Sequence, residues 1–283
     1  MVHADRGTLI LHGAQLQWGA RTYIMGIVNV TPDSFSGDGL EDPQAATARA
    51  IAQWDAGADL LDLGGESTRP HHQPVAQAVE LARVVPVIEA VAARVPQAPI
   101  SVDTYKPAVA RAAHALGAEI VNSVWGASDE LLDLVAELGM AVVAMHNQAG
   151  TGYDGPVIDA VLRYLEDCAT RAVARGIAPE RVVLDPGIGF GKTADQNLAV
   201  LQSLDRLVAL GFPTMVGTSR KSTLGRLTGR EPKERVYATA ATTALAIRTG
   251  IDVVRVHDVA AARDVVAVSD AIVRNWRPPG WIE

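Results

Sequence analysis

The sequence predicts a (β/α)8 TIM barrel preceded by an N-terminal β-hairpin, and three observations support this fold class. Eight short runs rich in branched apolar residues occur along the 283 residues, as expected of buried parallel strands. Alanine-rich segments with helical spacing separate these runs. Most of the segments are followed by a glycine, the residue that most easily takes the left-handed conformation after a helix. Strand and helix alternating eight times indicate a parallel sheet closed into a barrel.

The predicted elements begin with the hairpin and then alternate along the chain. Residues 8–22 are expected to form the hairpin, with a turn near His12 and Gly13 between the strands Thr8–Leu11 and Gln15–Trp18. The barrel strands are expected at Tyr23–Val28, Leu60–Leu63, Ile100–Val102, Glu119–Val121, Ala141–Met145, Val182–Leu184, Thr214–Val216 and Val253–Val256. The helices are expected at Ala45–Asp55, Ala76–Arg94, Ala108–Leu116, Leu131–Leu138, Ile158–Arg175, Leu198–Leu210, Glu234–Arg248 and Ala260–Arg274.

The glycines expected to end helices are Gly57, Gly117, Gly139, Gly176, Gly211 and Gly250. Residues 1–283 then form one domain, with 1–22 as its N-terminal segment. An open, doubly wound sheet is the alternative fold. It usually has fewer strands and a glycine-rich first turn, which this sequence lacks.

Composition limits the kinds of partner that the protein can have. A chain that is 48% hydrophobic can bury a sizeable core. Its net charge of −7 does not suggest a surface for nucleic acid, although a few arginines could still bind one phosphate group. The single Cys168 excludes an internal disulfide framework and suggests a reducing compartment. No signal segment or run of about 18 apolar residues is present, so we expect a cytoplasmic protein that contacts no membrane.

Polar residues follow all eight predicted strands. In a barrel, the carboxyl ends of the strands meet at one face, where the chemistry takes place. The opposite ends of the strands are mostly Gly, Ala and Pro, so the polar residues indicate one shared pocket. They are Asn29, the segment 64–70, Asp103, Asn122, His146, Asp185, the segment 217–221, and His257 with Arg255.

Two groups of these residues suit two kinds of ligand. The carboxylates of Asp103 and Asp185 accept N–H donors, while Lys221 donates and the Asn122 amide does both. Such a set fits a flat heterocycle with a donor edge and a carbonyl. The alternative is that these residues form salt bridges that tie strand ends together.

A second group of residues suits an anion. Arg255 and His257 share one face of the last strand, because side chains alternate along a strand. With Asn29 and Thr68 they suit a phosphate or diphosphate, although His257 could equally be a hydrogen-bonded core histidine. His and Cys ligands for a metal are not grouped in this sequence. Oxygen ligands together with a diphosphate could hold Mg²⁺.

Six motifs, in order, give the sequence a family resemblance. They are the segments 26–36, 64–70, 101–104, 185–192, 219–222 and 255–259. With these motifs the chain resembles the dihydropteroate synthases, pterin-binding transferases, along nearly its whole length. The resemblance implies condensation of 6-hydroxymethyl-7,8-dihydropterin diphosphate with p-aminobenzoate, which releases diphosphate and forms 7,8-dihydropteroate for folate synthesis. It further implies Mg²⁺ as cofactor, a homodimer and a target of sulfonamides.

The resemblance also implies roles for individual residues. The pterin would be bound by Asp103, Asn122, Asp185, Lys221 and Arg255, with Met145 and Phe190 beside the ring or the benzoate channel. The diphosphate would be bound by Asn29, Thr68, Arg255 and His257, with Mg²⁺ near Asn29. The p-aminobenzoate would be bound by Phe35, Thr68, Arg69, Pro70 and Ser222. The residues expected to act in catalysis are Asp103, Lys221, Arg255 and His257.

The implied mechanism follows from charge. Loss of diphosphate leaves a methylene cation conjugated with the pterin, so cation and anion develop together. Arg255 and His257 would face the departing anion, and Asp103 would stabilise the cation. The arylamine is neutral at pH 7, so its attack requires no strong general base.

The sequence departs from the family pattern at Ser123 and at His71 and His72, continues after the fifth strand with the variable segment 146–150, and leaves two rival functions open. Ser123 follows Asn122 where the family often has Asp. His71 and His72 follow Arg69 and Pro70, where the family commonly has a glycine. One rival is a pterin-dependent methyltransferase barrel, which handles no diphosphate. The other is a catalytically silent pterin-binding paralogue.

Overall fold

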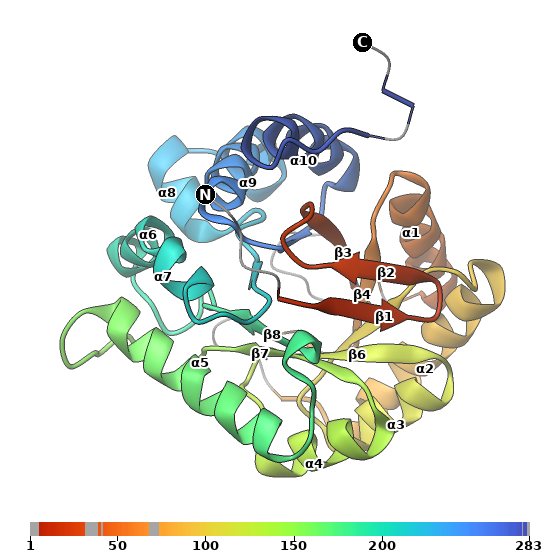
Figure 1. Cartoon of the computed structure of the whole chain (residues 1–283). Helices are drawn as coiled ribbons and strands as arrows, with labels where there is room; N and C mark the ends of the chain where they lie inside the picture. The colour runs from red at the N-terminus through yellow and green to blue at the C-terminus, as the bar shows by residue number, and fades with distance from the viewer. Residues whose placement is uncertain (1–5, 32–38, 41, 68–73, 279, 282–283) are drawn as a thin grey trace.

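The predicted barrel is confirmed. A computed structural model describes residues 6–31, 39–40, 42–67, 74–278 and 280–281. In this part of the chain, eight parallel strands surround a common axis (Figure 1). They are β3 (Tyr23–Asn29), β4 (Leu60–Gly64), β5 (Ile100–Asp103), β6 (Ala118–Ser123), β7 (Ala141–Met145), β8 (Val182–Asp185), β9 (Met215–Val216) and β10 (Val253–Val256).

The sheet closes between β8 and β9. The order of hydrogen-bonded neighbours is β8-β7-β6-β5-β4-β3-β10-β9. An isolated parallel bridge pairs Leu184 of β8 with Thr214, just before β9. The backbone N–H of Leu184 also donates to the carbonyl oxygen of Pro213 at 2.9 Å. These contacts join the two ends of the sheet, as the (β/α)8 prediction requires.

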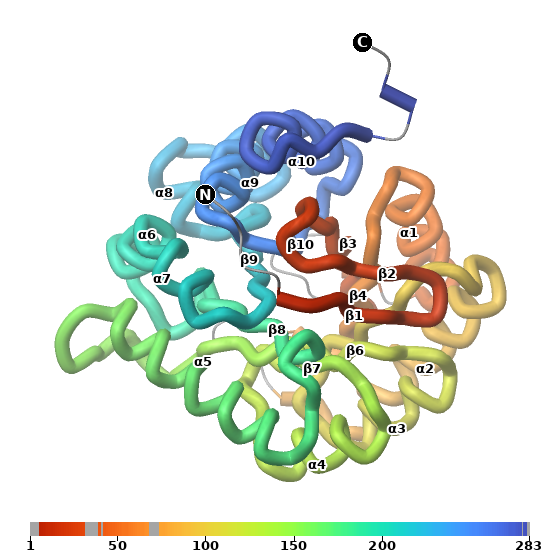
Figure 2. The backbone as a smooth tube through the Cα atoms, in the orientation of Figure 1, coloured from red at the N-terminus to blue at the C-terminus, as the bar shows by residue number. Residues whose placement is uncertain are grey.

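Helices surround the strands (Figure 2). Across the described residues, no helix is both long and apolar enough to cross a membrane. The helices are α1 (Pro43–Asp55), α2 (Gln77–Arg94), α3 (Pro107–Ala115), α4 (Asp129–Leu138), α5 (Val157–Ala174), α6 (Ala194–Gln202), α7 (Leu204–Val208), α8 (Ser222–Thr228), α9 (Val236–Thr249) and α10 (Val259–Val273), with 3₁₀ turns at Pro179–Arg181 and Pro232–Glu234.

The helices in the structure differ from the predicted ones at two places. The single helix expected at Leu198–Leu210 is two helices, α6 and α7, which meet at Ser203. The Ser203 hydroxyl donates back to the carbonyl oxygen of Ala199 at 3.0 Å, a bond that often accompanies a bend in a helix. The short helix α8 was not predicted, because its seven residues are too few to show a helical repeat. All six glycines expected to end helices have positive φ.

The N-terminal hairpin covers the end of the barrel where the strands begin. Its strands β1 (Thr8–Leu11) and β2 (Ala14–Gln17) pair antiparallel, and in Figure 1 they lie across the barrel in front of the strands. The apolar side chains of the hairpin pack against inward-facing side chains from the first halves of the barrel strands, and together they form one buried cluster. Its members include Leu9, Leu16, Trp18, Met25, Leu60, Ile120, Val143, Val183, Met215 and Val253.

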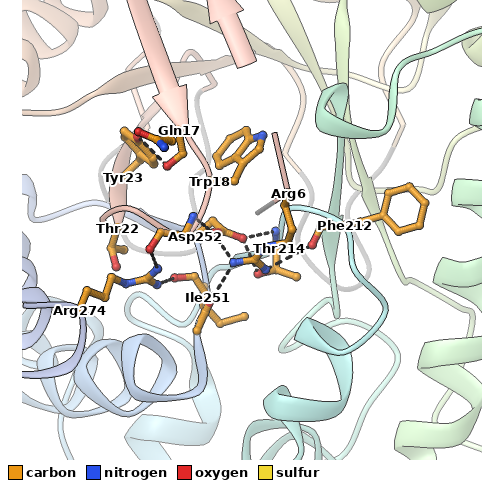
Figure 3. Close-up of polar contacts among 12 residues, drawn as sticks. Arg6, Gln17, Trp18, Thr22, Tyr23, Phe212, Thr214, Ile251, Asp252 and Arg274 are labelled. Atoms are coloured by element: carbon orange, nitrogen blue, oxygen red, sulfur yellow. Dashed lines mark hydrogen bonds and ion pairs between the residues drawn. The ribbon is translucent and has the colours of Figure 1, made fainter. Parts of the chain in front are cut away.

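Buried ion pairs fix this same end of the barrel (Figure 3). The Arg6 guanidinium lies 2.7 Å from the carboxylate of Asp252, and both side chains are buried. Asp252 also accepts from the backbone N–H groups of Gly19 and Thr214, at 3.0 and 2.9 Å. The residues before β3, β9 and β10 are therefore held together by groups that lie far from the polar strand ends.

The barrel interior consequently has two halves. Toward the hairpin it is filled by apolar side chains. Toward the carboxyl ends of the strands, the buried residues on the inward faces are polar, beginning with Asp62 and Ser101, which pair in register on β4 and β5. Since a buried polar group needs a partner, this upper half is where a ligand site is expected.

Candidate active site

Predicted ligand residues end consecutive strands. Asn29 ends β3 and pairs in register with Gly64 of β4, which pairs with Asp103 of β5, which pairs with Asn122 of β6. Met145 and Asp185 end β7 and β8 and also pair with each other. Asp103, Asn122, Met145 and Asp185 are buried, and Asn29 is half-buried. The structure therefore brings these side chains to one level of the barrel.

A buried carboxylate that was not among the predicted site residues joins several of them. Asp62 of β4 has no exposed surface. One of its oxygens, Oδ2, accepts from Arg255 Nε at 2.6 Å and from Asn122 Nδ2 at 2.9 Å. Arg255 Nη2 donates to Asp103 Oδ2 at 2.7 Å. Asp62 thus fixes both the Arg255 guanidinium and the orientation of the Asn122 amide.

Several polar atoms beside this network have no hydrogen-bond partner within the described residues. They are Asp62 Oδ1, Asp103 Oδ1, Asn122 Oδ1 and the hydroxyl of Ser101. A buried acceptor left unpaired costs about 1–3 kcal/mol, so the arrangement is explained best if a ligand supplies donors. Because Asn122 gives its NH₂ group to Asp62, the group it offers a ligand is its carbonyl oxygen.

Asp185 lies opposite this network, at the start of the β8–α6 loop. Its Oδ1 accepts from the backbone N–H of Gly187 at 2.7 Å. Gly187 has φ +70°, and a Cβ atom there would lie 1.9 Å from the carbonyl oxygen of His146. The loop can pass this close to the end of β7 because residue 187 is glycine.

The Lys221 ammonium completes the pocket. Lys221 lies directly before α8, half-buried, and its Nζ is 4.0 Å from the centre of the Phe190 ring. A Cβ atom on Gly189 would lie 3.0 Å from Lys221 Cδ, so the stem of the lysine packs tightly against the β8–α6 loop. Phe190 and Lys221, predicted to contact the same ligand, are in direct contact.

Burial shifts the pKa of three groups in this pocket. It raises the pKa of Asp103 to about 8, against the effect of Arg255, and it raises the pKa of Asp185. Burial lowers the pKa of Lys221 to about 8, an effect to which Arg255 adds. Perturbed titrating groups gathered in one cleft are typical of functional sites.

A second lysine binds the β8–α6 loop through hydrogen bonds to its backbone. Lys192 is buried, and its Nζ lies 2.9 Å from His146 Nδ1 and 3.0 Å from the carbonyl oxygens of Gly187 and Phe190. Burial lowers the pKa of His146 to about 4. The imidazole is therefore neutral near pH 7, and its Nδ1 can accept from Lys192.

His257 lies on the β10 side of the site. Its Nδ1 is 2.9 Å from the Ser219 hydroxyl, and its backbone N–H donates to the same oxygen at 3.2 Å. Arg255 donates hydrogen bonds to the carboxylates of Asp62 and Asp103, which belong to the predicted pterin side of the pocket. Its role at the diphosphate together with His257 stays a prediction.

The predicted p-aminobenzoate residues fall largely outside the described residues. Phe35, Thr68, Arg69 and Pro70 lie there, and Thr68 was also predicted to bind the diphosphate. Ser222 is described: it is exposed and is the first residue of α8.

No group of three or more His, Cys, Asp or Glu side chains that could hold a metal ion is found among the described residues. The predicted metal ligand Asn29 offers one amide oxygen at the end of β3. This donor set fits Mg²⁺ only if phosphate oxygens and water supply the remaining ligands.

Asp62 was missed because it lies inside a run that was interpreted as an ordinary strand, Leu60–Leu63. A signal was nonetheless present. A charged residue within a strand buried on both faces must be paired, so its partner had to come from the barrel interior. That reasoning would have led to Arg255.

The whole site lies within a stretch that matches a known family. Residues 25–257 match the family described as "Pterin binding enzyme". The dihydropteroate synthase of Clostridium beijerinckii is 41% identical over 261 residues, which cover 91% of this chain and 96% of that protein.

Solved structures of dihydropteroate synthases have the same fold as this chain. The Xanthomonas albilineans dihydropteroate synthase with 4-aminobenzoic acid superposes with a TM-score of 0.87 at 43% identity, covering 94% of this chain and 97% of that one. The Yersinia pestis dihydropteroate synthase in complex with a sulfonamide drug superposes with a TM-score of 0.89 at 37% identity, covering 95% and 100%.

Proposed function

The chain belongs to the pterin-binding enzyme family, with dihydropteroate synthases as relatives over nearly its whole length, and from this premise we propose how its site performs their reaction. The enzyme is a transferase. It condenses 6-hydroxymethyl-7,8-dihydropterin diphosphate with p-aminobenzoate to give 7,8-dihydropteroate and diphosphate. The relative from Yersinia pestis binds a sulfonamide drug, and we expect sulfonamides to compete with p-aminobenzoate here.

The observation that carries the pterin assignment is the surplus of acceptors in the pocket. Asp103 Oδ1 and Asn122 Oδ1 are buried and have no hydrogen-bond partner in the described part of the chain, and Asp185 adds a further carboxylate. A dihydropterin has an amino group and ring N–H groups along one edge, which match these oxygens. Its ring carbonyl matches the ammonium of Lys221. Phe190, beside Lys221, and Met145 provide apolar surface for the ring.

The site separates the charges that develop during the reaction. The bond between the pterin methylene and diphosphate breaks first, leaving a cation delocalised into the ring. Asp103 and Asp185 stabilise that cation through the ring N–H groups. His257 and Arg255 stabilise the departing anion, Arg255 after giving up one of its carboxylate contacts to the substrate. The neutral arylamine, bound by Ser222 and residues 68–70, then attacks the methylene carbon, and its nitrogen releases one proton to water or to the departing diphosphate as the C–N bond forms.

We propose Mg²⁺ as the cofactor, held by Asn29 and the substrate's phosphate oxygens. When bound there it neutralises part of the charge of the diphosphate. The lack of an acidic cluster among the described residues is consistent with an ion that requires substrate for its binding. Omitting the diphosphate should therefore abolish measurable Mg²⁺ binding in calorimetry.

We further propose a cytoplasmic homodimer that pairs through α9 and α10. The cytoplasmic location is supported by the free, buried Cys168. The dimer is supported by large apolar side chains that are exposed on adjacent helices, Tyr237 (88%) and Leu245 (64%) on α9 and Val268 (61%) and Ile272 (79%) on α10. Replacing Val268 and Ile272 by glutamate should give a monomer in light scattering.

The function is tested by incubating the protein with both substrates and Mg²⁺ and measuring diphosphate. Release that depends on p-aminobenzoate, together with formation of dihydropteroate, is expected. Pterin binding without diphosphate release would identify a silent pterin-binding paralogue. Methyl transfer from a methylated pterin would instead favour the methyltransferase alternative.

A further inference from the structure

Arg220 has a backbone conformation that arginine seldom adopts. Of the non-glycine residues described, two have positive φ: Arg220 (59°) and Asn275 (55°). Asparagine tolerates this left-handed region, whereas arginine is disfavoured there because its Cβ approaches the following carbonyl oxygen. Such strain persists only where the surroundings enforce it, and it is found most often at functional sites.

The side chain of Arg220 is bound by a carboxylate that lies after β10, at the N-cap position of α10. Arg220 Nε donates to Asp258 Oδ2 at 3.0 Å, and Nη2 donates to Asp258 Oδ1 at 2.6 Å. The arginine side chain is 7% exposed and the aspartate side chain 25%. This paired geometry, with little solvent, restrains the direction as well as the position of the arginine.

Helix α9 and the residue before it fix the backbone of the same turn. The backbone N–H of Arg220 donates to Thr239 Oγ1 at 3.3 Å, and Arg235 Nη1 donates to the carbonyl oxygen of Arg220 at 2.8 Å. Both backbone polar groups of the strained residue are thus bound. The turn Ser219–Arg220–Lys221 is held to the start of α10 through the Arg220 side chain and to α9 through its backbone.

The residues on either side of Arg220 are both used by the site. Ser219 binds the backbone N–H and the imidazole of His257 through its hydroxyl. Lys221 extends over the Phe190 ring, with Nζ 4.0 Å from the ring centre. A change in the turn would therefore move a predicted pterin ligand and a predicted diphosphate ligand at the same time.

A buried ion pair at the other end of the barrel offers a comparison. Arg6 and Asp252 lie 2.7 Å apart with both side chains buried, and they join the hairpin to the starts of β9 and β10 (Figure 3). Among the described residues of that cluster, positive φ occurs only at glycines, such as Gly7, Gly19 and Gly250. That pair has a purely structural setting, whereas the Arg220–Asp258 pair holds a strained turn between two site residues.

We propose that Arg220 and Asp258 are positioning residues, whose pairing holds the 219–221 turn so that the Lys221 ammonium and the His257 imidazole face the pterin diphosphate together. The substrate named here rests on the proposed function. The position of Lys221 itself does not, and it can be measured without any substrate.

Lysine labelling tests the position of Lys221 directly. The chain has four lysines, Lys106, Lys192, Lys221 and Lys233, and Lys233 is exposed and serves as the internal standard. Trace acetylation followed by mass spectrometry gives the ratio of Lys221 to Lys233 labelling. We expect this ratio to rise at least threefold in Asp258→Asn and in Arg220→Lys, with Lys192 unchanged. Asp252→Asn, the matched control, should leave the ratio at the wild-type value.

Kinetics and thermal unfolding complete the test. Both turn variants should lower kcat/KM for the pterin diphosphate at least tenfold, while Asp252→Asn should lower the Tm without this loss. The proposal is overturned if the labelling ratio is unchanged in both turn variants, if it changes equally in Asp252→Asn, or if kcat/KM stays at the wild-type value. If the wild-type enzyme releases no diphosphate, the proposed function fails, and the labelling ratios alone decide the positioning role.

Discussion

The guanidinium of Arg255 lies between two carboxylates, with Nε 2.6 Å from Asp62 Oδ2 and Nη2 2.7 Å from Asp103 Oδ2. Each carboxylate keeps its second oxygen, Oδ1, without a partner in the described chain. Arg255 therefore compensates the charge of two buried acids while leaving an acceptor on each of them. Burial raises the pKa of Asp103, and Arg255 opposes that shift.

Replacing Arg255 with lysine should reduce turnover much more than stability. Lysine keeps the positive charge but loses the planar fork that spans Asp62 and Asp103. We expect kcat to fall by about tenfold or more, equivalent to about 1.4 kcal/mol of lost transition-state stabilisation. Steady-state kinetics and thermal unfolding measure the two effects. Arg6→Lys at the far end of the barrel is the control, and wild-type turnover in Arg255→Lys would remove this residue from catalysis.

Replacing Asp185 with asparagine should weaken pterin binding. The change keeps the size of the side chain but puts an amide where a ligand's N–H donors require an acceptor. We expect a loss of about 2–4 kcal/mol, the range for a buried charged hydrogen bond left half-made, or roughly 30- to 700-fold in Kd. Calorimetry with a pterin ligand measures it, with Asp252→Asn as control. An unchanged affinity would mean that Asp185 serves only to fix the loop through Gly187.

The fold was predictable because its signals are local and repeated. Each strand is a short apolar run, and each of six helices is followed by a glycine that takes positive φ in the structure. The helix predictions failed where the helical pattern in the sequence was short or where no residue marked the break. Ser203 divides one predicted helix in two, and serine occurs within helices too often for its presence alone to predict a break.

The site was predictable as a set of strand-end residues but not as a network. The barrel geometry places Asp103, Asn122 and Asp185 at one level because parallel strands end together. Which of them bind each other depends on side-chain reach across the barrel, and sequence spacing carries no such information. Arg255 was predicted to contact both the pterin and the diphosphate, but its ion pairs with Asp62 and Asp103 were not predicted.

Trp18 should matter for stability and not for catalysis. Its side chain is 3% exposed and packs edge-on against Tyr23, with the ring centres 5.7 Å apart. Its Nε1 donates to the carbonyl oxygen of Glu180 at 2.9 Å. Trp18→Ala should lower the free energy of unfolding by about 3–5 kcal/mol, as for other large-to-small core changes. Urea unfolding measures this loss. At a temperature where the variant stays folded, kcat and both KM values should match the wild type, and a selective rise in one KM would contradict the separation of the two barrel ends.

The rate should depend on pH in a bell shape centred near pH 8. Burial raises the pKa of Asp103 to about 8 and lowers the pKa of Lys221 to about 8. The productive pocket needs Asp103 ionised, which requires a pH above its pKa, and Lys221 protonated, which requires a pH below its pKa. These opposite requirements give a maximum between the two limbs. Because the groups interact, the measured values belong to the pair.

The measurement for this prediction is kcat/KM for the pterin diphosphate, since it reports on groups of the free enzyme. Profiles should be recorded from about pH 6 to pH 10. The acid limb should disappear in Asp103→Asn, even if the remaining rate is low. A wild-type profile that is flat over this range would contradict the assignment of both groups.

Lys192 should stabilise the β8–α6 loop, and its contribution should depend on pH. Lys192→Met removes the donor to His146 Nδ1 and to the carbonyl oxygens of Gly187 and Phe190. Pterin affinity should therefore fall in this variant, whereas the surface variant Lys233→Met should leave it unchanged.

Burial lowers the pKa of Lys192 to about 7 in the folded protein, below its value of about 10.5 when unfolded. Between these two values the unfolded chain binds more protons than the folded one, so the contribution of this residue to stability rises with pH. Urea unfolding at several pH values should therefore show the wild type gaining stability relative to Lys192→Met from about pH 7 to pH 10. A constant difference over that window would mean that Lys192 stays charged in the folded protein.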